Sequence, residues 1–194
     1  MKPSPEFLEQ VRRRREELAR LCGEEFPEPE AITLEIGCGH GHFLTAYAEA
    51  HPNERCVGID ILAKRVRKGE AKANRRSLDN LSFIKAEALE FLDVLPEHVT
   101  LQRTFLLFLD PWPKKRHWKN RIVQAPLLDR LAARSPQGQL YFRTDHEGYF
   151  EWAVEHICAH PEWEIDDEAP WPFEAPSFFQ DLMESWQSLC ARRV

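Results

Sequence analysis

Cysteine is scarce in this 194-residue chain, and its positions show no pairing pattern. The cysteines are five in number, widely spaced and without a C-x-x-C pair: Cys22, Cys38, Cys56, Cys158 and Cys190. Small secreted domains that depend on disulfides have denser, paired cysteines. The pattern therefore predicts reduced thiols, argues against a disulfide framework and favours a cytoplasmic location.

Long apolar runs are absent as well. No stretch approaches the roughly 20 apolar residues that a membrane-spanning helix requires, and the start of the chain, MKPSPEFLEQVRRRREELAR, has no apolar core of a secretory signal. We therefore expect a protein that is neither secreted nor embedded in a membrane. Internal repeats, low-complexity tracts and long Gly/Ser linkers are also missing, so one shared hydrophobic core is expected.

Positive charge is missing from one part of the chain and concentrated in two others. No Lys or Arg occurs between Thr144 and Leu189. Seven basic residues accompany one acid between Lys64 and Arg76, and residues 112–121 are basic without any acid. The net charge of −6 taken alone argues against a nucleic-acid partner. Segregated charge still permits a positive face if the two basic stretches meet in space; two separate solvated faces are the alternative.

Short apolar runs alternate with amphipathic stretches along most of the chain. The periodicity predicts strands at 31–36, 55–59, 81–84, 105–109 and 139–143, and helices at 42–50, 64–76, 88–95, 122–133 and 149–159. Such alternation implies an α/β fold with a parallel sheet. Residues 1–30 are interpreted as a charged helix or arm before one domain over residues 31–194, whose Pro-rich tail after Trp163 is ambiguous.

A glycine-rich turn, Glu35-Ile-Gly37-Cys-Gly39-His-Gly41, follows the first predicted strand. Glycine is needed there because Cβ atoms would block the bend and the approach of a ligand to the backbone. A dinucleotide fingerprint would need glycine at His42, so a nicotinamide or flavin cofactor fits less well. The form E-x-G-x-G-x-G resembles motif I of Rossmann-like methyltransferases. That resemblance implies that Glu35 and Gly37 lie beside the methionine part of S-adenosylmethionine, whose ammonium favours a nearby carboxylate, and Gly39 is also assigned to the cofactor. A tight turn with an incidental acid is the alternative.

Two further acids follow the next two predicted strands. Asp60 ends the second strand, where a carboxylate can accept hydrogen bonds from both ribose hydroxyls of a nucleotide. Glu87 follows the third strand and is a candidate acceptor for the adenine amino group. Capping of the helix that follows is the alternative for both residues.

The most specific pattern begins at Asp110, directly after the apolar run 105–109. Open α/β sheets bind ligands at the carboxyl ends of their strands. The pattern D-P-W-P-K-K-R-H-x-K-x-R over 110–121, with T-D-H-E-x-Y-x-x-W over 144–152, is similar to the bacterial tRNA (guanine-N7-)-methyltransferase family. A D-P-W turn with a basic run after it is not a general methyltransferase feature. With the glycine turn, the resemblance runs from about Leu34 to Trp152.

This resemblance implies a Rossmann-like methyltransferase fold, with a mostly parallel seven-stranded sheet flanked by helices on both faces. It also implies S-adenosylmethionine as cofactor and tRNA as partner, with methylation of guanine N7 at variable-loop position 46. N7 already carries an in-plane lone pair, so the reaction requires no strong general base. Its acceleration is expected to come mainly from alignment of the reacting atoms.

By the same resemblance, Asp110 is the catalytic-site residue. It would orient guanine and stabilise the positive charge that grows on the purine, and it could also contact the cofactor. Lys114 and Asp145 are assigned to substrate binding, although Asp145 also suits a helix N-cap. Donors for RNA phosphates are expected from the rest of the basic loop: Lys115, Arg116, His117, Lys119 and Arg121. A solvated basic loop is the alternative. Trp112 and Trp118 could stack on an exposed base, and Trp112 could equally be a packing anchor.

The sequence departs from the family late in the chain. Many members carry T-x-F-E in the substrate pocket, whereas the corresponding segment here is Ser177-Phe-Phe-Gln180. Ser177 and Gln180 are therefore candidates for substrate binding without the acid's charge. The family also often has proline at the position of Leu109.

Two other functions are considered. A small-molecule methyltransferase would share the cofactor motifs but would not need the basic loop. A non-catalytic tRNA-binding protein would not need the glycine turn, Asp60 and Asp110. No metal site is expected, because three alternating residues on one turn, Cys38, His40 and His42, rarely converge on one ion. The sequence leaves open whether the protein is a monomer or a homodimer.

Overall fold

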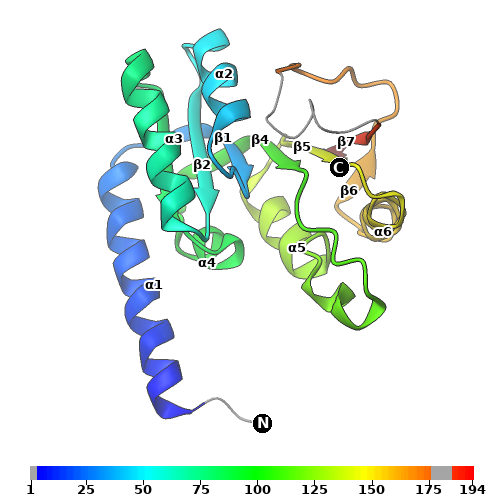
Figure 1. Ribbon diagram of the computed structural model, residues 1–194, viewed down its shortest axis with the longest axis horizontal. Helices are drawn as coiled ribbons and strands as arrows, with labels where there is room; N and C mark the ends of the chain where they lie inside the picture. Colours follow the sequence, from blue (N-terminus) through cyan, green and yellow to red (C-terminus); the bar gives the residue numbers. More distant parts are fainter. Residues whose placement is uncertain (1–3, 176–184) are drawn as a thin grey trace.

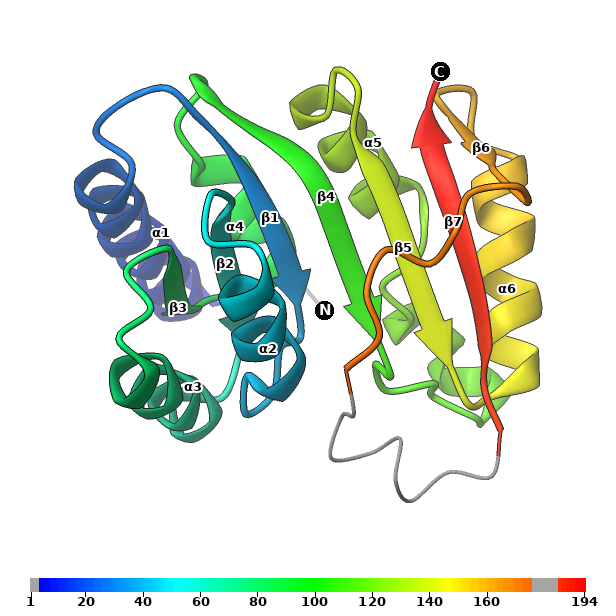
Figure 2. The ribbon, with the colours of Figure 1, turned by 90° about the horizontal axis from the view of Figure 1, so that it is seen from above.

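The computed structural model describes residues 4–175 and 185–194, in which seven strands form one sheet (Figures 1 and 2). The order across the sheet is β3-β2-β1-β4-β5-β7-β6. The strands are β1 (Glu30–Ile36), β2 (Arg55–Asp60), β3 (Leu81–Lys85), β4 (Val99–Leu107), β5 (Gln139–Thr144), β6 (Trp163–Ile165) and β7 (Gln187–Arg193). The helices are α1 (Pro5–Glu25), α2 (His42–Ala50), α3 (Ala63–Arg76), α4 (Ala88–Val94), α5 (Ala125–Arg134) and α6 (Glu147–Cys158), with a 3-10 helix η1 (Lys115–Asn120).

The sheet is mostly parallel, as predicted. β1 pairs in parallel with β2 and β4, β2 with β3, and β4 with β5. β7 runs antiparallel to both of its neighbours, β5 and β6. The carboxyl ends of the five predicted strands therefore meet at one edge of the sheet, which faces the reader in Figure 1.

Helices cover both faces of this sheet, which confirms the predicted layers (Figure 2). Residues of α1, α4, α5 and α6 belong to the larger buried cluster on one face. Residues of α2 and α3 belong to the second cluster, on the other face. Among the residues that the structure describes, no helix covers β5 and β7 on that second face. Trp171, in the segment after β6, packs there against Phe105 and Tyr141, and Phe173 packs against Phe43 and Tyr47 of α2.

Most elements lie within a few residues of their predicted positions, and β4 differs most. It begins at Val99 rather than at residue 105. Its first half contains polar residues, so the continuous apolar run that predicted the strand covers only its second half. Those polar side chains have partners, because Arg103 and Gln102 donate hydrogen bonds to Glu54 at 2.8 and 3.3 Å. The strand ends early because Phe108 adopts a left-handed backbone with φ of 50°.

The charged N-terminal segment forms α1. Ser4 caps the helix by accepting from the N–H of Phe7 at 3.2 Å, and Pro5 occupies the first turn, where no N–H is needed. Leu18 and Cys22 are the buried residues of α1. Within the described ranges, no helix is both long and apolar enough to cross a membrane.

Close packing around Phe83 gives a test of the core. A Cβ atom built on Gly58 in β2 would lie 2.6 Å from Cδ1 of Phe83 and 3.1 Å from Cβ of Cys38. We expect Gly58→Ala to lower the free energy of unfolding by about 1–3 kcal/mol, because a well-packed core does not accept an extra methyl group without strain. Urea denaturation would measure it. Gly23→Ala in α1, where a Cβ meets nothing within 4 Å, is the matched control and should not destabilise. Equal midpoints for the two variants would contradict the packing argument.

Candidate active site

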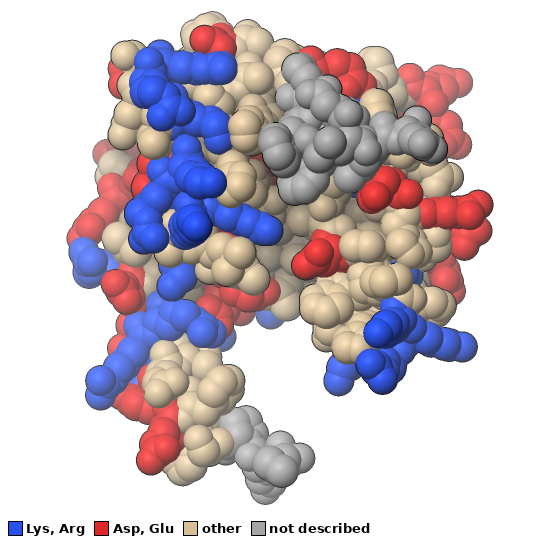
Figure 3. All heavy atoms as spheres, in the orientation of Figure 1, with Lys and Arg blue, Asp and Glu red and all other residues tan. Residues whose placement is uncertain are grey.

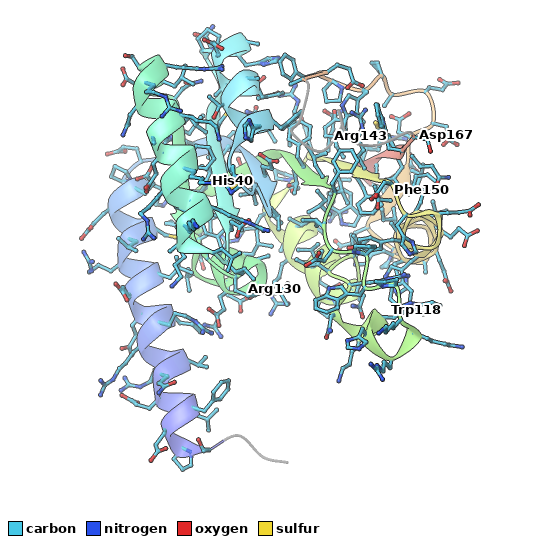
Figure 4. The ribbon with its side chains drawn as sticks, in the orientation of Figure 1. His40, Trp118, Arg130, Arg143, Phe150 and Asp167 are labelled. Carbon is cyan, nitrogen blue, oxygen red and sulfur yellow. The ribbon has the colours of Figure 1, made fainter. Side chains whose placement is uncertain are left out.

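The edge formed by the carboxyl ends of β1, β2, β4 and β5 carries the glycine turn, Asp60, the D-P-W loop and Asp145. Each follows the end of a different strand. Figure 4 shows two residues of this region on opposite sides of it: His40 lies next to α3, and Trp118 lies in η1. The parallel sheet thus brings together residues that are up to about a hundred positions apart in the sequence.

The glycine turn requires its glycines. Gly37, Gly39 and Gly41 have φ values of 72°, 55° and 68°, which side chains with a Cβ rarely adopt. The N–H groups of Gly37 and Cys38 donate to the carbonyl of Ile59 at 2.8 and 3.0 Å and so tie the turn to β2. The position beside Gly39 is open, with no atom within 4 Å of a built Cβ. A ligand can therefore approach the backbone there.

Asp60 links the glycine turn to the start of α3. Its side chain is 3% exposed. One carboxylate oxygen accepts from the N–H of Gly39 at 3.1 Å and from Arg65 at 3.4 Å, and the other accepts from the N–H of Leu62 at 2.8 Å. A carboxylate has room for further donors, so Asp60 can hold the turn and still receive a hydroxyl.

Glu35 is the unusual acid of the site. It is 4% exposed, and its Oε2 atom has no hydrogen-bond partner among the described residues. The pKa of Glu35 is raised to about 8: burial is the main cause, the N–H of Leu44 partly offsets it, and the charge of Asp60 adds to it. A buried carboxyl with an unused oxygen is costly unless a cation or donor completes it. Glu35 is therefore suited to a ligand with an ammonium group.

Glu87 and Asp145 are both exposed. Glu87 is the N-cap of α4 and accepts from the N–H of Glu90 at 2.9 Å, so the capping interpretation holds for it. The N-cap interpretation of Asp145 is wrong by one residue: His146 is the N-cap of α6, and its N–H donates to Oγ1 of Thr144 at 3.2 Å. Asp145 therefore stands at the strand end without that capping role.

The D-P-W loop follows β4, and the residue before it contacts the glycine turn. Phe108 and Trp112 both adopt left-handed φ, of 50° and 46°, which costs free energy for residues with side chains. The N–H of Phe108 donates to the carbonyl of Arg143 at 2.8 Å. The Leu109 side chain fills the space that a Cβ on Gly37 would need, at 2.3 Å. Asp110, the next residue, is exposed to solvent beside this contact.

Arg121 corrects one prediction. The sequence assigned it to RNA phosphates, but it is 2% exposed. It donates to the carbonyls of Pro111 and Gly148 at 2.8 and 2.7 Å and lies over the rings of Trp118 and Trp152 at 4.7 and 5.2 Å. Burial lowers the pKa of the guanidinium. Arg121 thus holds the loop in place, and the Trp118 side chain packs against it.

The rest of the basic loop remains available to a ligand. Lys114, Lys115, Arg116 and Lys119 are exposed at the start of and along η1. Trp112 stacks on His117, with ring centroids 5.8 Å apart and an interplanar angle of 7°. Four cations and a stacked ring pair therefore lie next to Asp110 in the chain.

Arg143 was missed by sequence reasoning. It is 5% exposed and makes two hydrogen bonds to Glu174, at 2.8 and 2.9 Å, and one to Ser188 at 2.8 Å. Its guanidinium lies 3.9 Å from the centroid of Trp171. Arg143 thus joins the end of β5 to the tail on both sides of residues 176–184. Nothing in the sequence distinguishes Arg143 from an exposed arginine.

Ser177 and Gln180, the two late candidates for substrate binding, fall outside the described residues.

The two basic stretches do not form one continuous surface. Figure 3 looks onto the carboxyl ends of the parallel strands and shows one group of Lys and Arg over α3 and another over η1. Uncharged and acidic side chains lie between the two groups. The segregated charge therefore gives two positive patches, one on each side of the candidate site.

Comparison with known proteins agrees with this geometry. A family model described as putative methyltransferase matches residues 29–184. A tRNA (guanine-N(7)-)-methyltransferase of Rhodospirillum rubrum is 34% identical over 163 residues, which are 83% of this chain and 61% of that protein. One of Chromohalobacter salexigens is 38% identical over 142 residues, 73% of this chain and 56% of that protein. The chain thus spans about six-tenths of the length of these relatives.

Solved structures share the fold at low identity. An rRNA methylase from Streptococcus thermophilus superposes with a TM-score of 0.58 at 10% identity, over 100% of this chain and 99% of that one. The strand order, the reversed β7 and the glycine turn define a Rossmann-like methyltransferase domain. The chain belongs to the putative methyltransferase family whose model it matches.

The raised pKa of Glu35 predicts a pH-dependent stability. An unfolded chain ionises this carboxyl above about pH 4.5, whereas the folded protein keeps the proton up to about pH 8. Stability should therefore fall as pH rises through that window, by up to about 1.4 kcal/mol per pH unit from this group. Glu35→Gln should remove that loss, so its advantage over the original chain should grow between pH 5 and pH 8 in urea denaturation. An advantage that does not change with pH would show that Glu35 ionises normally.

Proposed function

We propose that this protein transfers a methyl group from S-adenosylmethionine to N7 of a guanine in tRNA, at variable-loop position 46 by family resemblance. The observation that carries the proposal is the packing of Leu109, the residue before the D-P-W loop, against Gly37 of the glycine turn. Asp110 directly follows Leu109, so it lies close to the turn that would hold the cofactor, and the basic η1 residues follow further along the same loop. The names of the relatives support the reaction, and a cytoplasmic location is proposed with it.

The residues at the strand ends fit S-adenosylmethionine. Glu35 offers an unpaired, buried oxygen to the ammonium of the methionine part. Asp60 can accept ribose hydroxyls, and the backbone beside Gly39 is open. Ile61 and Leu62, which follow Asp60, are 63% and 48% exposed and offer an apolar surface to the adenine. When bound, the cofactor would supply an electrophilic methyl group on sulfur. The N7 lone pair would attack this methyl carbon, and the electron pair of the broken S–C bond would remain on sulfur.

The protein's part is mainly positioning and electrostatics. Asp110 is exposed, so its carboxylate is free to meet the guanine edge and to stabilise the positive charge that grows on the purine. Lys114, Arg116 and Lys119 would neutralise phosphates next to the methylated nucleotide. Asp145, at the end of β5, is the second acid proposed to bind the substrate.

Methyl transfer to tRNA tests the function directly. The purified protein would be incubated with unmodified tRNA transcript and radiolabelled S-adenosylmethionine, and the digested RNA analysed for labelled nucleosides. We expect label in 7-methylguanosine, and we expect Asp110→Asn to lower turnover about 10- to 100-fold, since it removes the charge that stabilises the transition state. The Asp79→Asn variant changes an exposed acid in the turn after α3 and serves as the matched control.

The rival functions give other outcomes. Cofactor binding without RNA labelling would favour a small-molecule methyltransferase. Binding of tRNA without cofactor binding would favour a non-catalytic RNA-binding protein. Label in another nucleoside would overturn the assignment to N7.

Cofactor affinity should depend on pH through Glu35. An ammonium beside this carboxyl favours its ionised form, so binding should release a proton below about pH 8. We expect the affinity for S-adenosylhomocysteine to rise about tenfold per pH unit at most between pH 6 and pH 7.5. Titration calorimetry in two buffers of different ionisation enthalpy would measure the released proton. Glu35→Gln should bind more weakly and release none from this site; proton release unchanged in that variant would exclude Glu35 as its source.

A further inference from the structure

One surface of α3 has no part in the site described above. Val66, Gly69 and Ala73 face the sheet and are buried, so the helix is fixed in position. Three basic residues, Lys64, Lys68 and Arg75, project on one side of it, within about 40° of each other at about 100° per residue. All three are exposed. Figure 3 shows a group of Lys and Arg over α3.

These three cations lack acidic partners among the residues that the structure describes. Three other basic residues of α3 are engaged: Arg65 with Asp60, Lys72 with the carbonyl of His40, and Arg76 with Glu49. Lys64, Lys68 and Lys72 also follow each other at i, i+4 spacing, which destabilises a helix by about 0.2–0.5 kcal/mol per like-charged pair. α3 thus carries positive charges that no acidic side chain among the described residues neutralises.

The arginines of α1 show that this chain can balance such charge. Arg12 and Arg13 pair with Glu9, and Arg20 pairs with Glu24 at 2.6 Å. Arg14 and Arg15 reach across to Glu90 and Asp93 in α4. α1 has five arginines in 21 residues, all paired with acids, whereas α3 has seven basic residues in 14, and three of them form the unpaired stripe. An excess of positive charge does not stabilise a solvated helix, whereas it favours the binding of a polyanion.

The position of α3 indicates which polyanion. The helix lies beside the carboxyl edge of the sheet, and Figure 3 shows basic side chains over α3 and over η1 on that face. The part of the chain from Thr144 to Leu189 has twelve acidic residues and no Lys or Arg, and it would repel a polyanion. The unpaired stripe of α3 contains no aromatic side chain, so it suits phosphates rather than bases.

We propose that Lys64, Lys68 and Arg75 of α3 form a second docking surface for the tRNA phosphate backbone, separate from the η1 loop that surrounds the methylated nucleotide. The inference rests on the proposed function, since it assumes that tRNA reaches this edge. The tRNA would then be held on both sides of the site. Three phosphate contacts of this kind would contribute to affinity and to its salt dependence without reading sequence.

The test compares two triple variants with the same change in net charge. Lys64→Gln, Lys68→Gln and Arg75→Gln together remove the stripe. Arg12→Gln, Arg13→Gln and Arg20→Gln together remove paired arginines of α1 and form the control. Binding of tRNA transcript would be measured by fluorescence anisotropy from 50 to 200 mM salt, and methyl transfer by KM and kcat. Thermal unfolding and binding of S-adenosylhomocysteine would report on the fold and the cofactor site.

We expect the α3 variant to bind tRNA about 10- to 100-fold more weakly near 100 mM salt, with KM affected more than kcat. The slope of log K against log salt should become shallower by about 1 per lost contact. The α1 variant should stay within about twofold of the original chain. An α3 variant that matches the α1 variant in affinity and slope would overturn the proposal. If the unaltered protein neither binds nor methylates tRNA, the proposed function itself fails, which is a distinguishable result.

Discussion

The hydrogen bonds of Asp60 hold the candidate site together. This one carboxylate accepts from the N–H of Gly39 and from the N–H of Leu62, and thereby joins the turn after β1 to the start of α3. The turn needs that support because three of its glycines adopt left-handed backbone conformations. The same bonds fix where α3 begins, and so where its basic residues emerge. The candidate cofactor site and the positive surface beside it therefore depend on one buried acid.

A second constraint is the sheet, which helices cover on both faces. Polar functional side chains can therefore gather only at the ends of its strands. Strands covered on both faces bury nearly all of their side chains, and the polar residues that matter gather where the strands end. Leu109 closes one side of the glycine turn, and Arg121 and Arg143 anchor the segments around it through buried hydrogen bonds. Two residues of the loop take backbone conformations that cost free energy. Such strain is held only where the surroundings over-determine it, as they do around Arg121.

The distribution of charge reconciles the proposed RNA partner with a net charge of −6. The sum hides a division between an acidic tail and two basic patches at the carboxyl edge. The electrostatic field at the site depends on charges within about 8 Å at physiological salt rather than on the net charge of the protein. The contrast between the paired arginines of α1 and the unpaired cations of α3 separates charge that stabilises the fold from charge available to a partner.

The sequence by itself determined the alternation of elements, the glycine turn and the D-P-W pattern, because these depend on local periodicity and on residues with special backbone freedom. It could not determine the start of β4, since Arg103 and Gln102 find their partner, Glu54, only in the folded protein. Sequence reasoning also assigned Arg121 to RNA phosphates, and it did not identify Arg143. The presence of an arginine in the sequence does not show whether backbone carbonyls and aromatic rings surround its side chain in the folded protein. The tertiary structure decided which charges are buried and which remain exposed, because burial and pairing arise from residues far apart in the chain.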